Sequence, residues 1–175
     1  HQDYAYFPHT NTDLVAIMVM LDDATPENGC MSFVRGSHKL GLLNHSNAAG
    51  YFTGGCLETK YWEQHPENVV PVTPRAGGIS MHHSLMLHGS PPNLSGKPRR
   101  GLVIQYRAAD AYALADDIWD DTGLVVSGKH GQSVRCTAGT VLLPRWPHRF
   151  GYGHGNAWNQ VGEFATAVNG DKLKV

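Results

Sequence analysis

Short apolar runs separated by turn-forming segments are the main pattern over the first 107 residues. The longest run, residues 14–21, is continuously apolar and leads into the polar segment 22–29. Its length and the turn that follows favour a β-strand covered on both faces over a turn of buried helix. By the same criteria we predict further strands at residues 30–34, 69–72, 79–83 and 102–106, and one that carries His88. Short strands between turns are typical of a β-sandwich or barrel.

Two segments depart from this pattern. Residues 3–9 are aromatic and include Pro8, which predicts a short strand that runs into a loop. The aromatic side chains there either line a substrate pocket or belong to ordinary barrel packing. Residues 40–68 lack periodicity and are rich in glycine and aromatic residues. A loop of this length inside a compact domain is usually a lid or a binding loop, so we expect it to cover a bound substrate.

The length of 175 residues suits one domain with a sizeable core. We predict a single domain over residues 1–175, with a barrel core at 1–110 and a C-terminal extension at 111–175. The extension contains an acidic turn or helix start at 116–121 and a brief strand at 140–143. Because its apolar and aromatic residues need cover, we expect the extension to pack on the barrel.

The charge balance argues against two classes of partner. The chain has 14 Lys and Arg residues against 15 Asp and Glu residues, a net charge of −1, and therefore no electrostatic footprint for nucleic acid or an anionic membrane. It also lacks an apolar run of about 18 residues that could span a membrane. We expect a small-molecule substrate as partner, and the sequence specifies no oligomeric state.

The cysteines and the first residue give two further expectations. Cys30, Cys56 and Cys136 are odd in number and form no C-x-x-C pair, which argues against a disulfide framework or a zinc ribbon. A reducing compartment such as the cytoplasm fits best. The chain opens on His1 rather than methionine, at a residue with candidate chemistry, so we expect a segment upstream of it in the gene product.

His1 and Asp3 form an H-x-D sequence. Two residues apart on a strand, their side chains would point to the same face and supply two ligands to a metal. His88 is the candidate third ligand, and His82 and His83 have to be weighed beside it. For any single histidine a structural role is the better starting expectation, so the combination carries the prediction. Two histidines and one carboxylate with open coordination positions form the facial triad of non-haem Fe(II) oxygenases.

Such a site leaves room on the metal for a bidentate 2-oxo acid and for dioxygen. The distal carboxylate of a 2-oxo acid needs a fixed cation, and Arg99 offers a planar bidentate fork. On a strand Arg99 shares a face with Gly101 and Gln105, and Gly101 would leave space beside the guanidinium for the acid. Ser90, two residues beyond His88, could add a hydroxyl hydrogen bond at the co-substrate or orient a metal ligand.

Taken in order along the chain, these features resemble the phytanoyl-CoA dioxygenase family. The resemblance covers about residues 1–107. It consists of the H-x-D sequence, the end of the apolar strand at 21–24, the segment Asn-Gly-Cys-Met-Ser-Phe-Val-Arg-Gly-Ser-His-Lys at 28–39, and His-Gly-Ser-x-x-Asn at 88–93 with Arg99 beyond it. As an ordered set these motifs are specific, whereas H-x-D alone would be weak.

The resemblance implies a double-stranded β-helix, which is a jelly-roll or cupin-like barrel, together with Fe(II), 2-oxoglutarate and dioxygen. It implies that His1, Asp3 and His88 ligate iron and that Arg99 binds the C5 carboxylate of 2-oxoglutarate. Related halogenases have Ala or Gly in place of Asp3, so hydroxylation or a related oxidation of a small organic substrate is favoured over halogenation. The family also has strands and co-substrate contacts before H-x-D, and this N-terminal part of the usual domain is absent from the chain.

Two other classes of protein compete with this hypothesis. If His1 were a mature N-terminus, its amine and imidazole could form the copper brace of a copper monooxygenase. That would require a secreted protein, in which unpaired cysteines are awkward. A non-catalytic or zinc-binding jelly roll could keep the same three ligands, but Arg99 would have no evident purpose there. The sequence does not identify the substrate.

Overall fold

The structure is a computed structural model that describes residues 1–115, 123–129, 131–137 and 139–144. The predicted acidic turn or helix start at 116–121 lies outside these residues. The predicted division into a barrel core at 1–110 and an extension at 111–175 is described only as far as residue 144 and stays a prediction.

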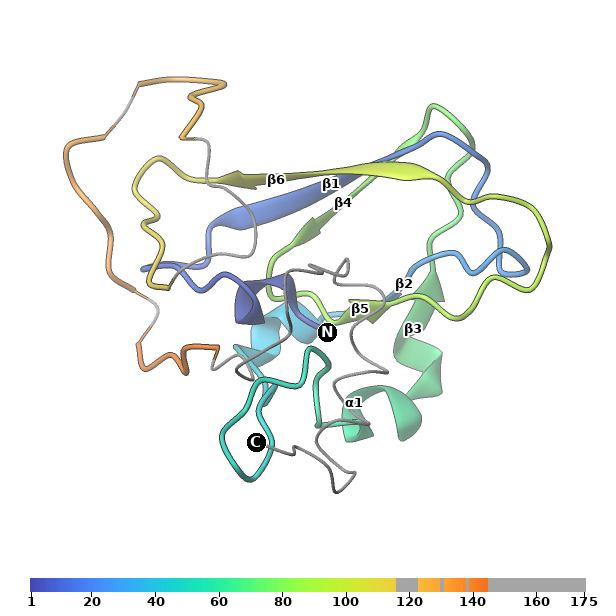
Figure 1. Cartoon of the computed structure of the whole chain (residues 1–175), viewed down its shortest axis with the longest axis horizontal. Coiled ribbons are helices and arrows are strands. Elements are labelled where there is room, and N and C mark those ends of the chain that lie inside the picture. The colour runs from blue at the N-terminus through green and yellow to red at the C-terminus, as the bar shows by residue number, and fades with distance from the viewer. Residues whose placement is uncertain (116–122, 130, 138, 145–175) are drawn as a thin grey trace, which may run out of the picture.

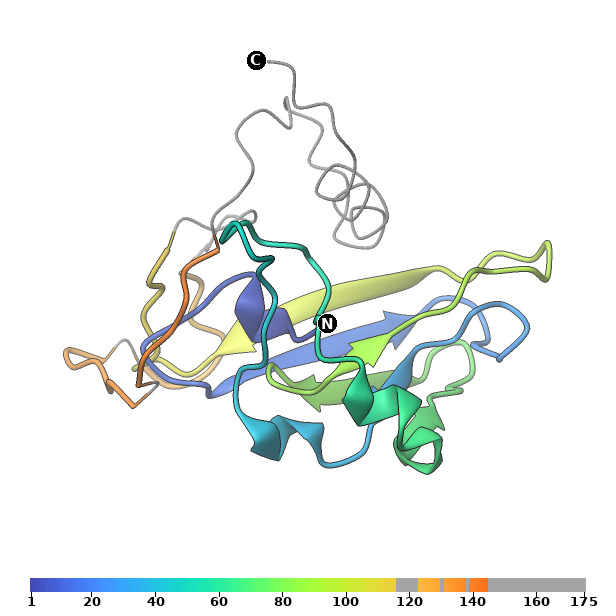
Figure 2. The same cartoon turned by 90° about the horizontal axis from the view of Figure 1, so that it is seen from below.

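The strands of the described residues form two three-stranded antiparallel sheets, which lie one above the other in Figure 1 and overlap in the view from below in Figure 2. The first sheet has the order β4-β1-β6, formed by Ile79–His83, Leu14–Met20 and Gly101–Arg107. The second has the order β3-β2-β5, formed by Val69–Pro71, Ser32–Val34 and His88–Gly89. The chain crosses between the sheets after β1, β3, β4 and β5. This connectivity confirms the predicted mainly β, jelly-roll fold.

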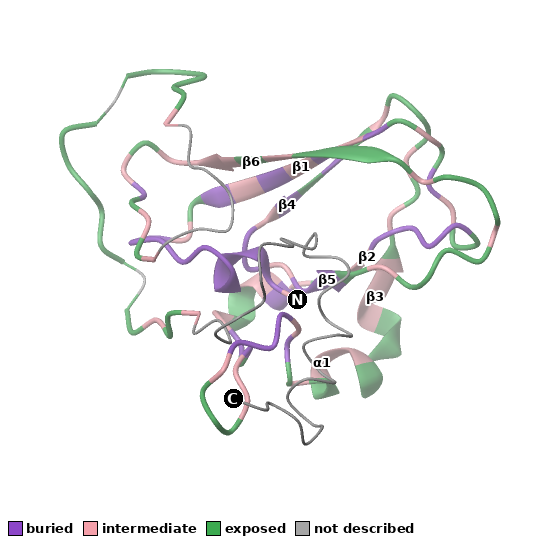
Figure 3. Ribbon diagram, in the orientation of Figure 1, coloured by how far each residue is buried: buried purple, intermediate pink, exposed green. Residues whose placement is uncertain are grey.

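β1 is the central strand of the first sheet, and its burial alternates from residue to residue. Every second residue from Leu14 to Met20 is buried, and the residues between them are half-buried (Figure 3). Ile79 and Met81 on the neighbouring β4 are more than half exposed, at 56% and 57%. The expectation of a strand covered on both faces is therefore right only for the inner face, which looks toward the second sheet.

Two of the predicted strands are wrong. Residues 3–9 contain a 3-10 helix, Asp3–Ala5, because the carbonyls of Gln2 and Asp3 accept hydrogen bonds from Ala5 and Tyr6. Residues 140–143 are not a strand, and they have no ladder partner among the described residues. The strand predicted at 30–34 starts only at Ser32, since the amide of Cys30 donates to the preceding turn.

The segment 40–68, predicted as a loop, contains two short helical pieces, α1 at Lys60–Glu63 and η3 at Pro66–Asn68, and follows η2 at Ser37–Leu40. Leu43 and Cys56 of this segment are buried together with Val34 and Leu87 of the second-sheet region. The segment therefore covers one face of the second sheet. None of the helices in the described residues has the length and apolarity needed to cross a membrane.

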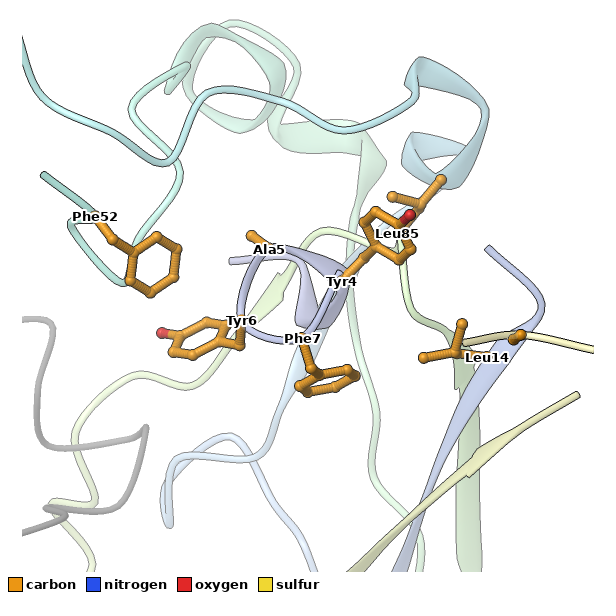
Figure 4. Packing of buried hydrophobic residues seen from close by; sticks show 8 residues of the cluster. Tyr4, Ala5, Tyr6, Phe7, Leu14, Phe52 and Leu85 are labelled. Atoms are coloured by element: carbon orange, nitrogen blue, oxygen red, sulfur yellow. The ribbon is translucent and has the colours of Figure 1, made fainter. Parts of the chain in front are cut away.

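The largest buried apolar cluster of the described residues surrounds this 3-10 helix, η1 at Asp3–Ala5 (Figure 4). Tyr4, Tyr6 and Phe7 are at most 5% exposed and pack with Leu14 and Phe52. The hydroxyl group of Tyr6 donates to the carbonyl of Gly54 at 2.6 Å, so the buried phenol is satisfied. Of the two readings of these aromatic residues, the structure supports packing.

The residues that follow β6 lie along the N-terminal segment 9–13. The amide of Ala108 donates to Asp13, and the amide of Thr137 donates to Thr10. Arg135 makes ion pairs with both Asp13 and Asp110. The described part of the predicted extension thus packs against the residues that lead into β1.

Gln2, between the two candidate ligands of the H-x-D sequence, is completely buried. Its side-chain amide donates to the carbonyls of Gly41 and Leu85 at 2.8 and 2.7 Å, and its carbonyl oxygen accepts from the amide of Leu43 at 2.8 Å. The middle residue of the sequence is therefore a structural anchor, which fixes the direction in which its two neighbours point.

His45 completes this anchor. The backbone amide of Gln2 donates to Nε2 of His45 at 3.1 Å, while Nδ1 of His45 donates to the carbonyl of Leu43 at 2.9 Å. This pairing requires a neutral imidazole. Burial, only partly opposed by the hydrogen bond to Leu43, lowers the pKa of His45 to about 4.

The His45 pairing predicts a loss of stability in acid. Because the folded-state pKa lies below the ordinary value of 6.5, the stabilisation is complete above pH 6.5 and is lost as the pH falls toward 4. As the pH falls from 6.5 to 4, the titration of His45 alone should lower the free energy of unfolding by roughly 3 kcal/mol. Denaturant unfolding of the metal-free protein at several pH values measures it.

His45→Gln keeps an acceptor but does not titrate, so its stability should depend less on pH between 6.5 and 4 than that of the wild type. His65→Gln, at an exposed position, is the matched control and should follow the wild type. A His45→Gln profile parallel to the wild-type profile would contradict the assignment.

The turn between β1 and β2 is closed by a contact at Gly29. Gly29 has a φ of +75°, and a Cβ there would lie 2.5 Å from the carbonyl oxygen of Pro91 and 3.2 Å from the amide of Asn93. These are backbone atoms, which cannot swing aside as a side chain can. Glycine at this position therefore allows the turn to lie against the loop between β5 and β6.

Gly29→Ala and Gly36→Ala form a matched pair. Both residues have a positive φ, but a Cβ at Gly36 meets nothing within 4 Å. Gly36→Ala should cost only the left-handed backbone strain, about 1–2 kcal/mol. Gly29→Ala should lose roughly 1–3 kcal/mol more through overlap. Denaturant unfolding compares the two, and equal losses would show that the contact at Gly29 has no energetic weight.

Candidate metal centre

His1 and His88 are held side by side by their backbones. The backbone amide of His88 donates to the carbonyl of His1 at 3.0 Å, and the backbone nitrogen of His1 donates to the carbonyl of His88 at 2.7 Å. In an antiparallel pair of this kind the two side chains leave on the same face. The imidazole centroids are 4.2 Å apart.

Asp3 brings its carboxylate to these two rings. Its Oδ1 lies 3.3 Å from Nε2 of His1 and 3.4 Å from Nε2 of His88. One ligand atom from each of the three residues lies within 4.8 Å of the others. The structure thus brings together the three residues predicted from the sequence. His1 and Asp3 do not lie on one strand as predicted, because Gln2 is extended and the 3-10 helix begins at Asp3.

The protonation of His88 indicates that a cation fits this centre. Its Nδ1 donates to the carbonyl of Met86 at 2.9 Å, so in the neutral ring Nε2 carries a lone pair. Burial and the neighbouring His1 lower the pKa of His88 to about 3 despite the opposing effect of Asp3. The lone pair of Nε2 therefore faces the carboxylate oxygen Oδ1 of Asp3. Two acceptors that face each other in a buried site suit a metal ion between them.

Asp3 remains ionised in this environment. Its burial raises the pKa of the carboxyl, but the surrounding imidazoles, with hydrogen bonds from His1 and His82, outweigh burial and hold the pKa well below the usual range. A neutral imidazole and an ionised carboxylate are the protonation states that metal ligands need.

Two further residues contact Asp3 from the first sheet. Nε2 of His82 lies 3.1 Å and Nε2 of Gln105 lies 3.2 Å from Oδ2 of Asp3. His82 was weighed only as one histidine among several, and Gln105 only as a residue on the face of Arg99. The alternation of side chains along β4 and β6 was the signal that could have placed both residues on the face of the first sheet that looks toward Asp3.

Arg99 lies apart from the triad, in a small cavity between the sheets. The cavity is lined by three methionines and by Ser80, and Nε of Arg99 is buried without a hydrogen-bond partner among the described residues. The predicted space beside Gly101 is filled, because a Cβ there would meet the Met18 side chain at 3.2 Å. A buried guanidinium nitrogen without an acceptor is costly unless an anion binds there.

Ser90 lines a different cavity, of about 620 Å³, whose wall also includes His1 and His88. Its hydroxyl oxygen is buried and has no hydrogen-bond partner within the described part of the chain. The structure therefore does not bring Ser90 and Arg99 into one pocket. Cys56 and Trp62 of the segment 40–68 lie in the same wall as Ser90, so this segment does border the cavity next to the triad.

The family model of phytanoyl-CoA dioxygenase (PhyH) matches residues 1–101 of the chain. Two curated relatives have more specific names. A probable alpha-ketoglutarate-dependent hypophosphite dioxygenase of Stutzerimonas stutzeri is 36% identical over 74% of this chain and 46% of its own length. A methylphosphonate hydroxylase of Gimesia maris is 31% identical over 69% of this chain and 43% of its own length. The chain spans less than half the length of these relatives.

Solved structures agree with the fold. The non-haem monooxygenase ThoJ is similar with a TM-score of 0.57 and 29% identity over 85% of this chain and 50% of ThoJ. The non-haem alpha-ketoglutarate-dependent carbocyclase SnoK from nogalamycin biosynthesis has a TM-score of 0.50 and 29% identity over 64% of this chain and 44% of SnoK. Together with the family model, which covers more than half of the residues, these matches mean that the chain belongs to the phytanoyl-CoA dioxygenase family.

Proposed function

We propose that the protein is an Fe(II)- and 2-oxoglutarate-dependent dioxygenase in which His1, Asp3 and His88 hold the iron. The observation that carries this proposal is the convergence of one ligand atom each from His1, Asp3 and His88, which lie within 4.8 Å of one another. Bound iron would supply the activation of dioxygen, coupled to the decarboxylation of 2-oxoglutarate to succinate and CO2. The side chains would supply ligands, orientation and exclusion of water.

Arg99 is the proposed partner of the distal carboxylate of 2-oxoglutarate. Its buried Nε without an acceptor supports this role, because a carboxylate would complete the hydrogen bonding of the guanidinium. The hydroxyl group of Ser90, in the wall beside His88, is proposed to donate a hydrogen bond to the bound co-substrate. The half-buried Arg99 also favours an oxygenase over a zinc-binding or non-catalytic jelly roll, in which Arg99 would have no evident purpose.

The substrate is proposed to be a small organic molecule that is oxidised at a C–H bond. The names of the two relatives mention hypophosphite and methylphosphonate, which are small phosphorus oxyanions. The described wall of the 620 Å³ cavity is mostly apolar, with Val34, Trp62 and Leu87, and contains no lysine or arginine. Such a wall suits an uncharged or apolar group better than an oxyanion.

The first test is an anaerobic titration with Fe(II) and then 2-oxoglutarate, followed by a screen for succinate release in the presence of oxygen. We expect one iron per chain and a substrate-dependent release of succinate. The screen should contain hypophosphite and methylphosphonate beside uncharged organic compounds. Release only with the phosphorus oxyanions would contradict the proposed substrate class, and iron binding without any use of 2-oxoglutarate would contradict the proposed activity.

Arg99→Lys tests the co-substrate site. Lysine keeps the charge but loses the bidentate fork, so the Kd for 2-oxoglutarate should rise roughly 10- to 100-fold, the equivalent of one charge-assisted hydrogen bond. The affinity for Fe(II) should stay near the wild-type value. Arg100→Lys is the matched control, because Arg100 is exposed and paired with Asp22. An unchanged Kd in Arg99→Lys would mean that another cation holds the acid.

The three cysteines are free thiols, two of them buried. We propose a reducing compartment, such as the cytoplasm, as the place where the protein acts.

A further inference from the structure

We infer that His82 and Gln105 are positioning residues that hold Asp3 through one carboxylate oxygen and leave the other oxygen for the metal. The inference rests on the proposed function, since it concerns the same metal centre. It assigns a role to two residues that are not ligands themselves.

The two oxygens of Asp3 have different neighbours. Oδ1 faces the imidazoles of His1 and His88 at 3.3 and 3.4 Å. Oδ2 faces Nε2 of His82 at 3.1 Å and Nε2 of Gln105 at 3.2 Å. A carboxylate held in this way presents a single oxygen to a metal ion, because two N–H groups already occupy the second oxygen.

The sheet register explains why these two side chains meet at Asp3. Ala16 on the central strand β1 pairs with His82 on β4 and with Gln105 on β6. The three side chains therefore leave the same face of the sheet in one row. The side chain of Ala16 is only a methyl group, which leaves room for the longer side chains on either side to converge on one oxygen.

The surroundings of His82 favour a hydrogen-bond donor over a fourth ligand. His82 is buried, and its ring packs against Phe33 at 5.0 Å between centroids. Because a carboxylate only accepts, Nε2 of His82 carries the proton in its contact with Oδ2. Nδ1 of His82 is buried with no hydrogen-bond partner among the described residues. His82 therefore has one described hydrogen bond, the one to Asp3.

Gln105 supplies the same kind of contact from the other side. Its amide nitrogen donates to Oδ2, and unlike a lysine it does not add a positive charge that would compete with the metal. Two N–H donors thus stabilise the ionised carboxylate through one of its oxygens. The negative charge of Asp3 remains available to a cation at Oδ1.

Anaerobic titration with Co(II), followed by visible absorption, tests this inference without a need for turnover. His82→Leu and Gln105→Leu should each raise the Kd for Co(II) by about 10- to 100-fold, as is usual for residues that orient a ligand. His82→Gln restores an N–H donor and should recover most of the affinity. The ligand-field spectrum at saturation should be the same in all variants, because the donor set does not change.

His83→Leu is the control for the loss of a histidine on β4. His83 follows His82 on the strand and points to the other face. The His83→Leu variant should therefore bind Co(II) as tightly as the wild type. Thermal unfolding without metal checks that each variant folds. If His82→Leu does not fold, Gln105→Leu decides, because Gln105 is an exposed residue whose replacement the fold should tolerate.

The outcomes separate the two proposals. If the wild type does not bind Co(II), the metal centre and the proposed function fail. If the wild type binds but His82→Leu and Gln105→Leu bind equally well, only the positioning role is overturned. If His82→Leu loses binding far beyond 100-fold with an altered spectrum, and His82→Gln does not recover it, then His82 is a ligand and the inference is wrong.

Discussion

The structure depends on one buried negative charge, the carboxylate of Asp3. An isolated carboxylate in a protein interior is unfavourable by several kcal/mol, and partners must offset this cost. Here the partners come from both sheets. The His1 and His88 side chains approach one oxygen, and His82 and Gln105 approach the other. The carboxylate therefore joins the two layers of the jelly roll at the place where a metal can bind.

The segment that carries Asp3 is held in place by the hydrogen bonds of Gln2. Gln2 is fully buried, and each polar atom of its side chain has a partner in a carbonyl or amide of the chain. His45 holds the backbone amide of Gln2. Because the residue between the two ligands cannot rotate, the ligands on either side of it keep their directions. Preorganisation of this kind is what a metal centre requires.

Among the described residues, the metal-binding triad and the Arg99 guanidinium border different cavities. The triad borders a cavity with a mostly apolar wall, whereas Arg99 lies among methionines in a smaller cavity. Under the proposed function, the metal-binding end of 2-oxoglutarate would bind at the triad and its distal carboxylate at Arg99. The organic substrate would then approach from the side of Trp62 and Val34.

The sequence by itself determined where most of the strands lie and which residue types could bind a metal. Apolar runs and turn residues are local signals, so the strands at 14–21 and 79–83 were predicted closely. The sequence pointed to His1 and His88 as neighbours of Asp3, but only the tertiary structure showed that His82, and not His83, also contacts it. Neighbours on a strand, such as His82 and His83, point to opposite faces, and the face that turns inward depends on pairing with β1, far along the chain. It also decided that H-x-D leads into a 3-10 helix, because the buried contacts of Gln2 and the packing of the aromatic residues after it outweigh the local preference for a strand.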